Sequence, residues 1–204
     1  MVSLQERMKV YRKQLEKGEI IDAYRGLMAY FQDLRLYFKK KYPDYFVSGI
    51  YYGYMDMTYF AFSPESLKKR KLKIAIVFVH EKFRFEAWLS GYTRDIQAKY
   101  LELITESGWD KYRTTDNVDS IIERTLVDEP DFDDLEAITE KIEGGALEFI
   151  EDVNVFLGSN SLSLLRITLL RKQVQHGRVV GTFSFGSGYP RAVDPCSIFI
   201  PCCE

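Results

Sequence analysis

The sequence predicts a single α+β domain in which an antiparallel sheet is flanked by helices. Hydrophobic residues recur at helical spacing near the N-terminus and again after the middle of the chain, and the region between is rich in aromatic and β-branched residues. The strand-like segments follow one another without crossover helices, which favours α+β over α/β. We expect a sheet of about three to four strands, formed by residues 46–62, 72–79 and 83–90.

Two helices are predicted before the sheet. Ser3 and Glu6 have the spacing of a capping box, and Gly18 ends the short helix that they open. In the second helix, which ends near Lys40, hydrophobic residues follow at alternating steps of four and three. This spacing places them on one side of the helix. They are Ile20, Tyr24, Leu27, Phe31, Leu34 and Phe38.

The strands are predicted from residue type and from alternation. Residues 46–62 are mostly aromatic and β-branched, and Gly49 and Gly53 indicate a turn or bulge inside this run. Residues 72–79 form an apolar run typical of a largely buried strand, and polar and apolar residues alternate in 83–89. These last two strands are expected to form a hairpin that turns near residues 80–82.

Three helices are predicted after the sheet. Thr93 caps the first, which Gly108 ends, and Asp116 begins a shorter one. The apolar residues of this shorter helix are Val118, Ile121, Ile122 and Leu126. The third helix begins after Pro130 and keeps a heptad-like apolar spacing, with a kink expected at 144–145, where two glycines adjoin.

Composition and charge exclude several classes of protein. The chain has 204 residues with 28 basic and 30 acidic side chains, and this net charge of −2 argues against a dedicated nucleic-acid binder. No uncharged apolar stretch is long enough to cross a membrane, and the N-terminus lacks the pattern of a signal peptide. The chain is therefore expected to be cytoplasmic.

The composition changes after residue 157. Residues 1–157 hold 23 basic and 28 acidic residues, whereas 158–204 hold 5 and 2, together with all three cysteines. Cys196, Cys202, Cys203 and His176 match neither a zinc-site spacing nor a prenylation signal. We therefore expect 1–157 to be the domain, and 158–204 to be an appendage that is flexible or loosely docked.

Aromatic residues are concentrated between Tyr30 and Phe62, where 13 of 33 residues are aromatic and eight of these are tyrosine. A buried tyrosine hydroxyl needs a hydrogen-bond partner, so tyrosine clusters are common at pocket walls and interfaces. The sequence thus favours a non-enzymatic binding module for a small molecule or a protein. The alternative is that the cluster is core. The candidate binding residues are Tyr52, Tyr54, Met55, Asp56, Tyr59, Glu86 and Trp88.

A hydrolase or nuclease-like enzyme is the second hypothesis, with Asp56, His80 and Glu86 as candidate catalytic residues. Histidine beside carboxylates can act as a general base near neutral pH, and an Asp and a Glu on neighbouring strands can hold a divalent metal. However, nuclease-type sites usually carry a lysine where this chain has Trp88, and the sequence contains no established catalytic motif. The alternative interpretation is that His80 and its charged neighbours form a cluster of ion pairs on the surface. The sequence predicts no metal site, and it indicates no cofactor.

Two charged runs have structural as well as functional interpretations. The basic run 68–71 and Lys73 are suited to phosphates, or form a solvated turn that prevents edge pairing. Residues 128–152 contain 11 acidic residues and one lysine, and the acids at 131, 133 and 134 stabilise a helix N-terminus. Docking of a basic partner on this acidic run remains open, as does the oligomeric state.

Several motifs resemble a family of small bacterial cytoplasmic proteins, a domain of unknown function. They are residues 41–46 (KYPDYF), 53–60 (GYMDMTYF), 79–82 (VHEK), 84–91 (RFEAWLSG) and 96–100 (IQAKY). The resemblance covers residues 1–157 and implies that this segment is a complete unit. It implies no activity and no catalytic residue.

Overall fold

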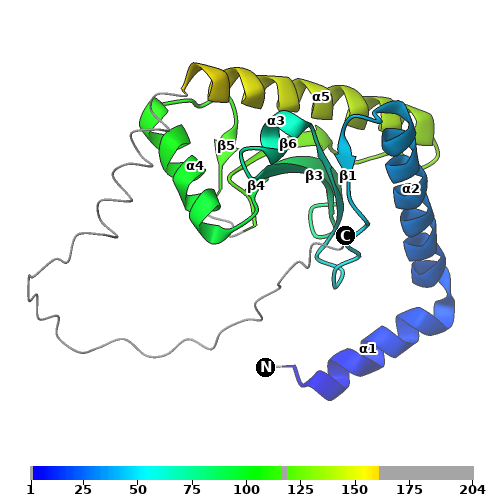
Figure 1. Ribbon diagram of the computed structural model, residues 1–204. Coiled ribbons are helices and arrows are strands. Elements are labelled where there is room, and N and C mark those ends of the chain that lie inside the picture. The colour runs from blue at the N-terminus through cyan, green and yellow to red at the C-terminus, as the bar shows by residue number, and fades with distance from the viewer. Residues whose placement is uncertain (1, 116–118, 161–204) are drawn as a thin grey trace, which may run out of the picture.

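The computed structural model describes residues 2–115 and 119–160, and it shows one antiparallel sheet with helices packed on one face (Figure 1). The predicted α+β class, with helices at both ends of the domain, is confirmed. The strands lie in the order β1-β2-β3-β4-β6-β5. They are β1 (Phe46–Val47), β2 (Met57–Ser63), β3 (Leu72–Val79), β4 (Arg84–Gly91), β5 (Arg113–Thr114) and β6 (Ile122–Val127).

The helices begin and end largely where the sequence predicts. They are α1 (Leu4–Lys17), α2 (Glu19–Lys41), α3 (Glu65–Lys68), α4 (Arg94–Ser107) and α5 (Leu135–Ser159). The capping box at Ser3 and the Thr93 cap are both present, and Asp134 caps α5. α5 is one continuous helix through Gly145, where a Cβ would lie 2.8 Å from Leu126 Cδ2. This glycine therefore allows α5 to approach β6 closely.

The sheet has six strands, so the expected three to four are too few. One reason is that residues 46–62 do not form one strand but fold back on themselves. Val47 pairs with Phe62, and Tyr51 forms a bridge with Tyr59. Gly53 makes the reversal possible, because its φ is +64° and a Cβ there would lie 2.0 Å from the Met57 carbonyl oxygen.

The second reason is that the short helix predicted from Asp116 is wrong. Residues 122–127 form β6, which pairs with β4 and also with β5. The apolar spacing of this segment fits a helix, but its β-branched residues fit a strand equally well. The open edge of β4 supplies hydrogen-bond partners for the backbone N–H and C=O groups of residues 122–127. This pairing favours the strand over the helix. Asp116 itself lies outside the described residues.

The predicted C-terminal appendage, residues 158–204, falls almost entirely outside the described residues. Only Gly158, Ser159 and Asn160 of this segment are described, and the first two belong to α5, which Asn160 caps. The division at residue 157 therefore stays a prediction.

Helices α2, α4 and α5 cover one face of the sheet, and the core lies between them and the strands (Figure 1). The centre of this core is aromatic. Phe38 packs against Phe60 and Phe62, with ring centroids 5.9 and 4.6 Å apart, and Phe31 packs against Phe85 at 5.8 Å. Much of the predicted aromatic cluster is therefore core, as the alternative interpretation held.

Two tyrosines of α2, Tyr30 and Tyr37, and its C-cap residue Tyr42 belong to the same core and reach α5 with their hydroxyl groups. Tyr30 bonds Thr139 (3.1 Å), and both Tyr37 and Tyr42 donate to the Glu143 carboxylate. Lys41 adds an ion pair to Glu143 at 2.7 Å. These contacts explain why these positions carry tyrosine and not phenylalanine, and they connect the partly buried Glu143 carboxylate of α5 to the end of α2.

Glu143→Gln is expected to make the stability of the protein less dependent on acid pH. Burial of Glu143 raises its pKa, but hydrogen bonds from Lys41, Tyr42 and Tyr37 outweigh this effect and leave the pKa below its ordinary value of 4.5. The unfolded chain then binds more protons than the folded one, so the contribution is present above about pH 4.5 and is lost as pH falls through the lowered pKa.

Urea unfolding of both proteins across the acid range measures this effect. The wild-type midpoint should fall more steeply with decreasing pH than the midpoint of Glu143→Gln. Glu140→Gln, at an exposed position on the same helix, is the matched control and should follow the wild type. Parallel curves for wild type and Glu143→Gln would contradict the assignment.

Candidate functional site

The sheet face opposite α2, α4 and α5 carries a second, smaller apolar cluster. It consists of Ala75, Val77 and Trp88, with Met57 and Tyr59 packed against them. Alternation along β3 and β4 creates this face, because the neighbours of these residues in the chain point into the core. We call it the second face of the sheet.

A hollow of about 70 Å³ lies on the second face. In the register of the sheet, Ala75 lies opposite both Ala61 on β2 and Trp88 on β4. The small side chain of Ala75, on the strand between those of Tyr59 and Trp88, lines the hollow and leaves space between the two larger side chains. The rim is formed by Tyr51, Lys73, Ser90 and Asp119.

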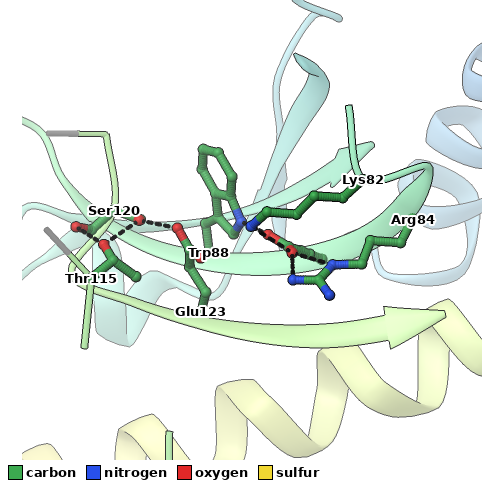
Figure 2. A network of polar contacts seen from close by, with 7 residues as sticks. Lys82, Arg84, Trp88, Thr115, Ser120 and Glu123 are labelled. Atoms are coloured by element: carbon green, nitrogen blue, oxygen red, sulfur yellow. Dashed lines mark hydrogen bonds and ion pairs between the residues drawn. The ribbon is translucent and has the colours of Figure 1, made fainter. Parts of the chain in front are cut away.

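Glu86 lies beside Trp88 and is almost completely buried, with 1% of its side chain exposed. One carboxylate oxygen accepts from Arg84 Nε at 2.6 Å and lies 3.5 Å from Lys82 Nζ, and the other accepts from Trp88 Nε1 at 2.6 Å. Figure 2 shows Lys82, Arg84 and Trp88 meeting at this point of the sheet. The carboxylate therefore fixes the indole ring that forms part of the floor of the hollow.

The loop on the other side of Trp88 is held by a separate network (Figure 2). Ser120 Oγ donates to Glu123 Oε1 at 2.6 Å and lies 2.9 Å from Thr115 Oγ1. Ser90 Oγ donates to the Asp119 carbonyl at 2.6 Å. These bonds position Asp119 at the rim, so the hollow is framed by fixed groups on this side.

Tyr51 supplies a polar group on the side of β2. Its ring lies 5.0 Å from that of Tyr59, and its hydroxyl is buried without a hydrogen-bond partner in the described part of the chain. Burial raises the pKa of Tyr51, so the phenol stays protonated. A buried hydroxyl without a partner costs free energy.

The predicted binding residues divide into two groups. Tyr59, Glu86 and Trp88 share the second face. Tyr52, Tyr54 and Met55 lie on the exposed turn before β2, where Tyr54 is 85% exposed, and none of the three lines the hollow. Asp56 shapes that turn, since its Oδ1 accepts from the Tyr54 and Met57 amides at 2.8 and 2.7 Å.

Several residues of the hollow were not among the sequence candidates. The alternation of 72–79 already places Lys73, Ala75 and Val77 on one face, so this signal was available in the sequence. Tyr51 and Asp119 reach the hollow from loops, and their positions depend on the fold of those loops.

The three candidate catalytic residues do not come together. His80 lies on the core side of β3, where its Nε2 is 3.0 Å from Thr58 Oγ1, whereas Glu86 lies on the second face. The Thr58 hydroxyl donates to the Tyr52 carbonyl, so His80 Nε2 must carry the proton. Burial lowers the pKa of His80, although Asp56 opposes this shift. The imidazole is therefore neutral near pH 7 and serves as a donor to the Thr58 hydroxyl on β2.

Other kinds of site are also missing from the described part of the chain. There, no three His, Cys, Asp or Glu side chains gather closely enough to hold a metal ion. Nor does any helix within residues 2–115 and 119–160 combine the length and apolar character needed to cross a membrane.

Comparison with known proteins identifies the family of the chain. Neither a curated protein nor a solved structure matched it significantly. A family model, described as a domain of unknown function (DUF7000), matches residues 4–157. This match begins at the first residue of α1 and ends within α5, so it includes both the core and the hollow of the second face. The chain belongs to this family, DUF7000.

Proposed function

We propose that the domain is a protein-binding module and that the hollow receives one apolar or aromatic side chain of its partner. The observation that carries this proposal is the combination of an apolar floor with a polar, hydrogen-bonded rim. Protein interfaces have this arrangement around their anchor residues. Trp88 and Tyr59 supply the large aromatic surfaces, and Lys73 and Asp119 lie at the rim.

The size of the hollow favours a protein partner over a small molecule. Pockets for drug-sized ligands and cofactors usually measure about 300–1,000 Å³. The present hollow measures about 70 Å³, which suits one side chain and not a whole cofactor. A side chain that enters it also brings neighbouring backbone close to the polar side chains of the rim, Lys73, Ser90 and Asp119.

A photo-reactive residue at Met57, at the edge of the hollow, tests the proposal in cells that produce the full chain. We expect one recurrent cross-linked protein, identified by mass spectrometry. Ala75→Phe fills the hollow and should abolish this cross-link. Lys73→Glu changes only the rim and should weaken it. The same photo-reactive residue at Glu140, which is exposed on α5, is the control and should not capture this protein.

Two results would contradict the proposal. One is a cross-link from Met57 that persists in both Ala75→Phe and Lys73→Glu. The other is a small molecule that native mass spectrometry finds bound to the wild type and absent from Ala75→Phe, which would make the hollow a ligand pocket. Circular dichroism establishes that each variant is folded before the cross-links are compared.

A further inference from the structure

α1 carries an apolar stripe that packs against no part of the domain core. Leu4, Met8, Tyr11 and Leu15 follow at steps of four, three and four, which places them on one side of the helix. The first three are 75%, 49% and 51% exposed, and no residue of α1 is buried. Figure 1 shows α1 projecting from the lower end of α2, away from the other helices.

Such a helix is marginal by itself. An isolated helix of 14 residues is barely stable in water, and most helices gain their stability by packing an apolar side against another element. The capping box supplies part of this stability, but it leaves the stripe exposed to water. The family model begins at residue 4, so α1 is part of the family domain and not an addition to it.

Charge indicates what covers the stripe. Residues 3–17 contain five basic and two acidic side chains, a net charge of +3. The rest of the family domain, residues 18–157, contains 18 basic and 26 acidic side chains, a net charge of −8. α1 is therefore attracted to acidic protein surfaces, whereas an anionic membrane would attract α1 and repel the body that carries it.

The chain itself offers a surface of the required chemistry between β6 and the first turns of α5. Residues 128–140 contain no basic residue. They contain seven exposed acidic residues, which are Asp128, Glu129, Asp131, Asp133, Asp134, Glu136 and Glu140. Two exposed apolar side chains border them. Leu135 is 42% exposed, and Phe83 is 55% exposed and packs against Phe132. Acidic groups beside apolar ones complement a basic helix with an apolar stripe.

We propose that α1 docks on this acidic and apolar surface of a second copy of the chain, in a reciprocal two-fold dimer. In such a dimer each copy gives one α1 and receives the other, so the interface contains two docked helices. This doubling is important, since stable interfaces bury about 1,200–2,000 Å² and a single short stripe falls short of that. The proposal is independent of the hollow and of its partner.

Sedimentation of the full chain over a range of concentrations tests the proposal. We expect a dimer that Met8→Glu converts to monomer, with Kd raised by about 100-fold or more because the substitution acts twice in a two-fold dimer. Val10→Glu introduces the same charge on the other side of α1, and its Kd should rise much less. Leu135→Asp, on the receiving surface, should also dissociate the dimer, and added salt should weaken it.

Other outcomes overturn the proposal. A wild-type chain that is monomeric at all concentrations excludes the dimer. A dimer that Met8→Glu dissociates and Leu135→Asp leaves intact would mean that α1 pairs with α1 of the second copy. A monomeric chain that binds vesicles of anionic phospholipid, and loses this binding in Met8→Glu, would make α1 a membrane helix. Circular dichroism checks that the variants are folded, and unfolding is not expected because α1 contributes no buried residue.

Discussion

Phe85→Ala is expected to lower the free energy of unfolding by about 3–5 kcal/mol, the usual cost of removing a fully buried phenylalanine. Phe85 is 0% exposed, and its ring lies 5.0 Å from Phe78 and 6.0 Å from Tyr30. The substitution leaves a cavity between β3, β4 and α2 that these rings cannot refill without leaving their rotamers. Since domains are stable by only about 5–15 kcal/mol, much of the margin would be lost.

Phe83→Ala is the matched control for this experiment. Phe83 precedes the same strand and also lies beside Phe78, with ring centroids 5.4 Å apart, and beside Phe132 at 5.9 Å, but it is 55% exposed. We therefore expect a loss of less than about 1 kcal/mol. Urea unfolding followed by circular dichroism measures both variants. Equal losses would show that the core does not extend to Phe85 as described.

Glu86→Ala should lower the free energy of unfolding by about 2 kcal/mol, less than the cost of breaking a fully buried ion pair. The substitution leaves Arg84 and Lys82 without their carboxylate and Trp88 Nε1 without its acceptor. The side chains of Arg84 and Lys82 are 28% and 47% exposed, so water can reach both cations and reduces the cost. Loss of the Trp88 hydrogen bond should also release the indole ring.

A double variant separates the loss of a partner from the loss of the pair. Arg84→Met combined with Glu86→Leu removes both the carboxylate and its closest cation, and we expect it to recover most of the stability that Glu86→Ala loses. Glu81→Ala, at an exposed position before the same strand, should change stability little. The interpretation fails if the double variant is less stable than Glu86→Ala. Urea midpoints compare these variants, and Trp88 fluorescence can be read alone in a Trp109→Phe background.

Local sequence signals predict the helices well because their causes are local. The Ser3 and Glu6 side chains bond each other's backbone amides, and Thr93 bonds the Ile96 amide, within one turn of the helix. In residues 72–79 the two-residue period of a strand likewise groups Leu72, Ile74 and Ile76 on one face. For such features, the residues that determine the structure lie close to one another in the sequence.

The candidate site is predicted only in part, because only some of its residues are grouped by signals that are local in the chain. Alternation in 83–89 already groups Glu86 with Trp88, and the structure places Tyr59 on the same face. The turn at 53–56 moves Tyr52, Tyr54 and Met55 away from this face. That turn depends on Gly53, whose backbone meets Met57 across the reversal. The alternation of side chains between the two faces of a strand cannot be counted through a point where the chain reverses direction, so it does not predict the faces of residues 52–55.

The sequence alone determined the α+β class, the helices α1, α2, α4 and α5, and the inner strands β3 and β4. Only the tertiary structure decided that residues 122–127 pair with β4 as a strand. It also decided that Tyr30 and Tyr37 of α2 bond side chains of α5, and that Ala75 lies between Tyr59 and Trp88 in the floor of a hollow. The physical reason is that these features depend on contacts between residues far apart in the chain. Such contacts form when strand edges and polar groups must find partners in the folded domain.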